Sequence, residues 1–211
     1  IPGIFRGGTQ DTGLAGRIRS KAAGIVSENF LTRVGFLLSS IILSTLKSGQ
    51  TAVYSVAMIL LNYSFAFGDG LQTAALTLVG RSIGAGEFDS VRSYHRKCRL
   101  LGLIISAALS AIYIFGAGWF FSRFFTDDDS VKLGISFTYV AAALTFLPIP
   151  RLVNVGTMRG IGDVRSPMVI AVICVLLLNP AVSYVLTIRL SHGIWGIWQA
   201  TLISQCIWLS A

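Results

Sequence analysis

The feature that most constrains this chain is a series of six long apolar segments. They are Ile25–Leu46, Ala52–Val79, Leu100–Phe121, Leu133–Val155, Met168–Ile188 and Gly193–Leu209. A helix needs about 20 mostly apolar residues to cross roughly 30 Å of hydrocarbon, whereas barrel strands are far shorter and alternate in polarity. Lipid offers no partner to free backbone groups, so a helix is the remaining way to span it. The sequence therefore predicts an all-α integral membrane protein, a bundle of six transmembrane helices.

The composition agrees with a lipid environment rather than a water-facing surface. Hydrophobic residues make up 54% of the chain, charged residues only 12%, and the mean hydropathy is +0.73. Soluble domains usually carry about 25% charged residues. The net charge of +8 could indicate nucleic-acid binding, but the basic residues cluster between the apolar segments, where the positive-inside rule places them. We therefore expect membrane lipid, and no nucleic acid, as a partner.

Lys and Arg alternate strongly between the two sides of the predicted bundle. One side receives the N-terminal arm, the connection between the second and third segments, and the connection between the fourth and fifth; their basic residues are Arg6, Arg17, Arg19, Lys21, Arg81, Arg92, Arg96, Lys97, Arg99, Arg159 and Arg165. The positive-inside rule assigns this side to the cytoplasm. We expect a multi-pass plasma-membrane protein with both termini cytoplasmic, in which residues 1–21 form a basic arm.

The sequence lacks the motifs expected of an enzyme. Cys98, Cys174 and Cys206 show no CxxC spacing, and no Ser/His/Asp set or cluster of metal ligands stands out. Two glycine-rich stretches could suggest phosphate loops, but neither contains GxxxxGK[ST] or follows a predicted strand. We therefore expect no catalytic activity, no metal site and no organic cofactor.

Four features, in order along the chain, resemble the pattern of a known family. They are Glu28 near the start of the first segment, the glycine-rich stretches Gly68–Gly86 and Gly156–Pro167, and Asn179-Pro180 followed by Gly193–Trp198. Together they resemble the multidrug and toxic compound extrusion (MATE) family. There are two departures: Gly24 stands where many relatives have proline, and the fourth segment lacks the aspartate of some sodium-coupled relatives.

The resemblance implies a twelve-helix transporter built from two six-helix lobes, with the substrate cavity between or within them. This chain matches one lobe, residues 22–211, and a basic stretch at residues 1–21 that could serve as the interlobe linker favours the C-terminal lobe. The implied function is secondary active efflux: an antiporter lobe that exports organic cations or drugs, coupled to a proton or sodium gradient. A second six-helix lobe and a small cationic substrate are then its partners.

Seven polar residues within the apolar segments are candidates for binding substrate or the coupling ion. Ionisable side chains inside a bilayer are costly, which makes Glu28, Arg33, Asp69 and Arg151 functional candidates. The structural alternative is that Glu28 and Asp69 pair with Arg33 and Arg151, and Asp69 is the obvious partner for Arg33 on another helix. Asp69 could also face a hydrated vestibule. The amides Asn62, Gln72 and Asn154 complete the set, although such amides more often join helices.

Two prolines and a few adaptable side chains complete the candidate site. Pro148 and Pro150 should kink the fourth segment, as a hinge or as a static bend. Tyr54, Met58, Phe65 and Phe67 could line an apolar pocket or simply pack between helices.

Two other functions remain open at this point. A relative that flips lipid-linked precursors would need a more cationic cavity, so Arg33 and Arg151 both facing inward would favour an anionic lipid. A fragment that is inactive without its partner lobe would fit the absence of a starting methionine and the abrupt end at Ala211.

Overall fold

The computed structural model describes residues 12–44, 48–190 and 192–210, which are almost entirely helical. In chain order the helices are α1 (Thr12–Ser44), α2 (Ser48–Gly84), α3 (Phe88–Phe124), α4 (Asp128–Leu144), α5 (Pro148–Ile161), α6 (Arg165–Ala171), the π-helix η1 (Val172–Leu178), α7 (Asn179–Tyr184), the π-helix η2 (Val185–Arg189) and α8 (Ile194–Ser210). α1 begins at Thr12, within the stretch 1–21 that the sequence assigns to a basic arm. Residues 1–11 of that arm lie outside the described part.

Five stretches are long and apolar enough to cross a membrane. They are Ala23–Ser44, Thr51–Gly84, Phe88–Phe124, Asp128–Ile161 and Arg165–Arg189, and they match the first five predicted segments. The sixth segment is α8, which has 17 residues, or about 25 Å at 1.5 Å per residue. The expected all-α membrane bundle of six segments is therefore confirmed, with a short last helix.

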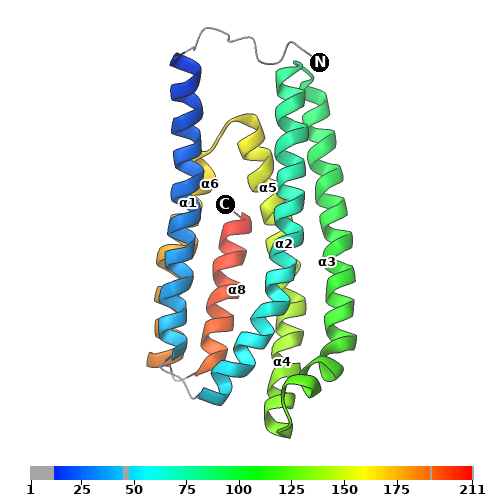
Figure 1. The fold of residues 1–211 in the computed structure, drawn as a ribbon, viewed down its shortest axis with the longest axis vertical. Coiled ribbons are helices and arrows are strands. Elements are labelled where there is room, and N and C mark those ends of the chain that lie inside the picture. The colour runs from blue at the N-terminus through cyan, green and yellow to red at the C-terminus, as the bar shows by residue number, and fades with distance from the viewer. Residues whose placement is uncertain (1–11, 45–47, 191, 211) are drawn as a thin grey trace, which may run out of the picture.

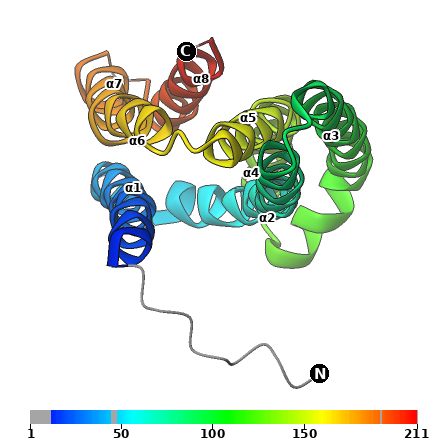
Figure 2. The ribbon, with the colours of Figure 1, turned by 90° about the horizontal axis from the view of Figure 1, so that it is seen from above.

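The helices form two groups that lie side by side along the long axis of the molecule (Figures 1 and 2). The first group is α2 to α5, in which α2 packs most extensively against α5 and also against α3 and α4. The second group is α1 with the continuous run from α6 to η2 and with α8. Contacts between the groups are sparse by comparison. We call the surface where they meet the intergroup interface.

The fourth predicted segment is interrupted where its prolines lie. α4 ends at Leu144 and α5 begins at Pro148, because the proline rings at 148 and 150 exclude the hydrogen bonds of a continuous helix. Two hydroxyls of α3 bind carbonyls near this break: Ser110 donates to Ala142 O at 2.5 Å, and Ser106 donates to Thr145 O at 3.3 Å. Such partners are needed because lipid cannot supply them. The α-helix is therefore interrupted over residues 145–147, at the place where the sequence predicts a kink.

The fifth segment contains a further irregularity that the sequence analysis did not predict. Pro180 has no N–H, and its ring would clash with the carbonyl four residues earlier. The chain widens into the π-helix η1 immediately before it, where Asn179 N–H donates to Cys174 O, five residues back. In addition, Ser204 of α8 donates its hydroxyl to that same carbonyl at 2.6 Å. The widened turn thus joins the fifth segment to α8.

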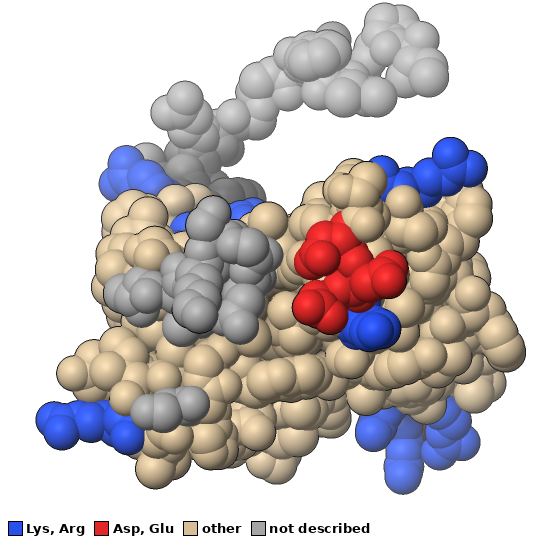
Figure 3. Space-filling model, turned by 90° about the horizontal axis from the view of Figure 1, so that it is seen from below, with Lys and Arg blue, Asp and Glu red and all other residues tan. Residues whose placement is uncertain are grey.

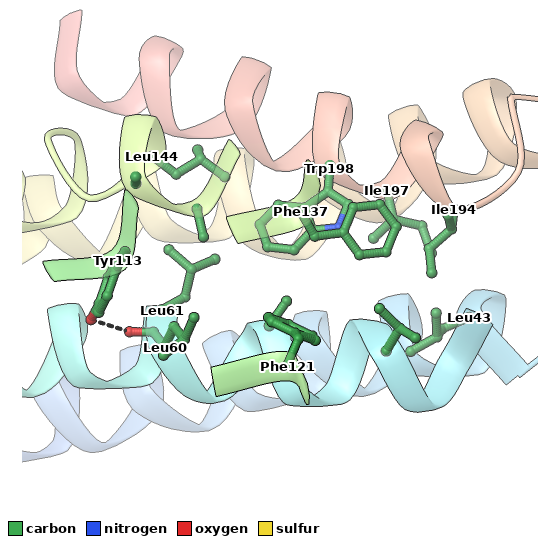
Figure 4. Packing of buried hydrophobic residues seen from close by; sticks show 14 residues of the cluster. Leu43, Leu60, Leu61, Tyr113, Phe121, Phe137, Leu144, Ile194, Ile197 and Trp198 are labelled. Carbon is green, nitrogen blue, oxygen red and sulfur yellow. Dashed lines mark hydrogen bonds between the residues drawn. The ribbon is translucent and has the colours of Figure 1, made fainter. Parts of the chain in front are cut away.

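The largest apolar cluster lies toward the lower end of Figure 1 and connects the two groups (Figure 4). Phe121 and Phe137 are fully buried, and Trp198 packs against Phe137 with ring centroids 5.7 Å apart. The hydroxyl of Tyr113 donates to Leu60 O at 2.6 Å, so α3 is also tied to α2 by a hydrogen bond. This cluster holds one end of the bundle together, and the charged residues considered next lie toward the other end.

Candidate functional site

Glu28 forms a buried ion pair with a residue that the sequence analysis assigned to a loop. Arg159 Nη2 donates to Glu28 Oε2 at 2.7 Å, and the two side chains are 9% and 7% exposed. Glu28 lies on α1 and Arg159 lies in the last turn of α5, so the pair connects the two groups of helices. Arg159 therefore lies in a helix rather than in a loop. Glu28 does form a structural ion pair, but its partner is Arg159 and not Arg151.

Arg33 and Asp69 do not take the roles expected of buried charges. Both side chains are exposed, and among the residues whose side chains are described neither forms an ion pair. Five positions separate Arg33 from Glu28 on α1, which places them about 140° apart around the helix. Because Glu28 faces the interior, Arg33 faces outward. The proposed pairing of Arg33 with Asp69 is therefore wrong.

Arg151 is the second cation inside the bundle. Its side chain is 6% exposed, and its guanidinium lies 3.9 Å from the ring centroid of Trp208 on α8 and 5.9 Å from that of Phe65 on α2. Within the described part of the chain, Arg151 Nε has no hydrogen-bond acceptor. Arg151 therefore sits at the intergroup interface, held by aromatic faces rather than by a carboxylate in direct contact.

The three candidate amides fall in different environments. Asn62 is exposed, so it faces away from the interface. Gln72 is half-buried, and its backbone lies directly against Gly156 of α5. The side chain of Asn154 is half-buried, and its Oδ1 is buried without a donor among the described residues. Of the three, Asn154 lies nearest to Arg151 along the chain, one turn away on α5.

A small cavity of about 30 Å³ lies at the intergroup interface. At 10–15 Å³ for each water, this is room for about two water molecules. Its walls come from both groups and include the fully buried Pro148 at the start of α5; the other lining residues are Phe36, Ser39, Tyr54, Met58, Leu61, Phe65, Leu144, Asn179, Ile197, Thr201 and Gln205. Three of the four side chains considered for an apolar pocket line it, while Phe67 is exposed. Pro150 is buried but does not line the cavity.

Three interior polar residues were missed as candidates. Arg159 was counted only as a loop charge, but it lies in the last turn of α5. Asn179 Oδ1 accepts from Ser39 at 3.0 Å and so joins α7 to α1. Gln205 is 5% exposed, and its Oε1 has no donor within the described ranges. An amide in a strongly apolar segment is the signal that could have identified both Asn179 and Gln205.

Comparison with known proteins identifies the family to which this helical arrangement belongs. The family model MatE matches residues 25–185. The chain belongs to the MatE family. The match covers most of the chain, including Glu28, Arg151 and Arg159, and it confirms the resemblance seen in the sequence. The protein is thus a membrane protein of a multidrug transporter family and not an enzyme.

Individual relatives show how much of a whole transporter this chain represents. It is 22% identical over 179 residues to a probable multidrug resistance protein NorM of Pseudomonas putida, covering 82% of this chain and 39% of that protein. For the NorM of Thermotoga maritima the identity is 28% over 175 residues, covering 81% and 37%. The crystal structure of a MATE protein in the straight conformation has a TM-score of 0.83 at 21% identity and covers 91% of this chain and 42% of that one. The chain spans about two fifths of these relatives, as one six-helix lobe does.

Proposed function

We propose that this chain is one lobe of an efflux antiporter that exports organic cations in exchange for protons or sodium. The names of its relatives, probable multidrug resistance proteins, support the drug-export part of this proposal. The partial coverage of those relatives supports the need for a second six-helix lobe. The cationic substrate and the coupling ion are supported by the buried carboxylate of Glu28.

The observation that carries the proposal is the ion pair between Glu28 and Arg159. A proton, a sodium ion or an organic cation that binds Glu28 competes with Arg159 for the single negative charge of its carboxylate. This competition is what antiport requires, because loading of one cation releases another. The pair also bridges α1 and α5, so its opening loosens the contact between the two groups of helices.

Transport in proteoliposomes tests this proposal. The chain is reconstituted together with a partner lobe, a gradient of protons or sodium is imposed, and movement of a fluorescent organic cation is recorded. We expect gradient-dependent transport that Glu28→Gln abolishes and that the exposed Glu87→Gln leaves unchanged. Transport by the Glu28→Gln variant at the original rate would remove Glu28 from coupling. Absence of transport by the chain alone, restored by the partner lobe, would show that the single lobe is inactive.

Export or flipping of anionic lipid-linked precursors is the alternative function. An anionic substrate would be favoured if both Arg33 and Arg151 faced inward. Arg33 is exposed and only Arg151 is buried, so the condition is half met. Efflux of cations is the function we favour, and Arg151 is considered separately below.

A further inference from the structure

Arg151 is a buried cation without a carboxylate in direct contact. Glu28 is engaged by Arg159 at 2.7 Å, and Asp69 is exposed on α2; both act on Arg151 only as neighbouring charges. Burying a charge without a paired and hydrogen-bonded partner is strongly unfavourable. The ring of Trp208 offsets part of that cost, but it covers only the face of the guanidinium. The N–H groups at the edge of a guanidinium still need acceptors.

Two amides with buried oxygen atoms lie within one helical turn of Arg151 or of the Trp208 ring on which it stacks. Asn154 follows Arg151 on α5 by three positions, and Gln205 precedes Trp208 on α8 by three positions, so each lies on the same face as its neighbour. Asn154 Oδ1 and Gln205 Oε1 are buried and lack a donor in the described part of the protein. A carboxamide can turn its NH₂ end to where its oxygen lies. Both amides can therefore donate toward the same acceptor as Arg151.

We propose that Arg151, with Gln205 and Asn154, binds an oxyanion, a carboxylate or phosphate group, at the intergroup interface. A guanidinium fork flanked by amide donors matches the oxygens of such a group. Because Arg151 is buried within this lobe, the anion must enter between its two groups of helices rather than from a partner lobe. This site is distinct from the Glu28–Arg159 pair, although Glu28 acts on Arg151 as a neighbouring charge, and it does not depend on cation efflux.

The adjoining cavity limits what the site can accept. Gln205 and Phe65 both line it, so the cavity reaches the surroundings of Arg151. A volume of about 30 Å³ holds about two water molecules, so a small charged head group must displace that water and a whole drug molecule does not fit. The oxyanion is therefore either a small free anion or the head group of a lipid-like molecule whose chain extends between the helices.

Tryptophan fluorescence of the full chain distinguishes these sources, because Trp208 stacks on Arg151. The chain is purified in dodecyl maltoside, a detergent without phosphate, then titrated with inorganic phosphate or with hexadecyl phosphate. Hexadecyl trimethylammonium serves as the cationic control. We expect a saturable change in emission with one or both phosphate probes, absent with the cationic control and absent in Trp208→Phe. A response to inorganic phosphate identifies a soluble anion, and a response to the alkyl phosphate alone identifies a lipid head group.

Variants of the same site decide whether Arg151 is responsible. Arg151→Lys keeps the charge but loses the planar fork, so the apparent affinity should fall at least tenfold. Gln205→Glu supplies a carboxylate within the chain; it should raise the melting temperature and eliminate the response. Gln199→Glu, the same change at an exposed position of α8, keeps the acceptor oxygen that contacts His192 Nδ1 at 3.0 Å. It should leave both properties unchanged.

Three results would overturn the proposal: no saturable response to either phosphate probe, an unchanged affinity in Arg151→Lys, or a full response that persists in Gln205→Glu. The fluorescence results for Arg151→Lys and Gln205→Glu count only if the circular dichroism spectrum of each variant matches that of the original chain. If Arg151→Lys does not fold, the comparison of Gln205→Glu with Gln199→Glu still tests the proposal. Only Gln205→Glu should lose the fluorescence response.

Discussion

Glu28 and Arg159 form a buried ion pair, so each provides the opposite charge that offsets the burial of its partner. Removing one partner of a buried pair leaves an uncompensated charge and typically destabilises a protein by about 3–5 kcal/mol. We expect Arg159→Gln to lower the free energy of unfolding by roughly that amount, measured by denaturant titration in detergent micelles. The double variant Glu28→Gln with Arg159→Gln should recover more than half of the loss, because no charge is then left alone.

The matched control is the neighbouring Arg165→Gln. The side chain of Arg165 is exposed, and a surface change of this kind usually stays within about 0.5 kcal/mol. If Arg159→Gln were no more destabilising than Arg165→Gln, the ion pair would not contribute to the stability of the lobe.

Sequence reasoning at the level of single residues found the charges but not their partners. Glu28 and Arg151 were identified as interior candidates because ionisable groups in apolar segments are rare, and both are buried. Arg33 met the same criterion but faces outward. It lies on the same helix as Glu28, but about 140° further around the helix axis. Arg159 lies 131 residues away from Glu28, and nothing in a single sequence indicates which distant side chains meet.

The contact between α2 and α5 depends on two glycines spaced as Gly156-x-x-x-Gly160. A Cβ added at Gly156 would overlap the backbone of Gln72, and one added at Gly160 would lie 2.9 Å from Val79. Small residues at this spacing allow helices in membranes to approach closely. We expect Gly156→Ala to destabilise the lobe by about 1–3 kcal/mol, as overpacking does, measured by thermal unfolding in detergent.

Gly70→Ala is the control for that substitution. Gly70 lies on α2, and a Cβ there would meet nothing within 4 Å. Alanine favours helix over glycine by about 1 kcal/mol, so this variant should be as stable as the original chain or slightly more so. Equal melting temperatures for the two alanine variants would show that the α2–α5 contact tolerates a methyl group at Gly156.

The first turn of α6 is held by Asp163, which lies between two spans, one residue before the N-cap Val164. Its Oδ1 accepts from the backbone N–H groups of Arg165 and Ser166, both at 3.1 Å. Hydrogen bonds from Ser166, and then from Arg165, hold the pKa of this carboxyl below its ordinary value of 3.8. Asp163→Ala should cost about 1 kcal/mol at neutral pH, the usual effect of losing a cap, seen as a lower melting temperature.

The pH dependence of that difference follows from the direction of the pKa shift. Because the folded-state pKa is depressed, the stabilisation is fully present above pH 3.8 and is lost as the pH falls through the lower folded-state value. The gap in melting temperature between the original chain and Asp163→Ala should therefore be constant from pH 5 to 8 and shrink only in more acidic buffer. A gap that already closes between pH 5 and 8 would argue against the cap.

The positions of the helices could be predicted from the sequence more completely than the contacts between them. Length and hydropathy located all six apolar segments, and the two prolines located the break between α4 and α5, because both are properties of local sequence. The π-helix before Pro180 was missed, since proline indicates a disturbance but does not say whether the helix ends, kinks or widens. The spacing of Gly156 and Gly160 was a usable signal for the α2–α5 contact that the sequence analysis did not use.

The distribution of charge over the whole molecule predicts its orientation in the membrane. Asp127, Asp128 and Asp129 lie at the start of α4, which is at the lower end of Figure 1. Figure 3 shows acidic side chains gathered in a patch on that face. The basic cluster of Arg92, Arg96, Lys97 and Arg99 lies at the opposite end, in the first turns of α3. The positive-inside rule assigns the basic end to the cytoplasm.

Cysteine labelling in intact cells tests this orientation. In a Cys206→Ser background, where the remaining Cys98 and Cys174 are buried, a single cysteine is introduced at the exposed Asp128 or at the exposed Ser93. A maleimide that cannot cross membranes should label Asp128→Cys directly and Ser93→Cys only after permeabilisation, because the two positions lie on opposite sides of the bilayer. The reverse pattern would place the basic end of α3 outside. Glu28 and Arg159 would then lie toward the extracellular side, and cations would be loaded in the direction of uptake rather than efflux.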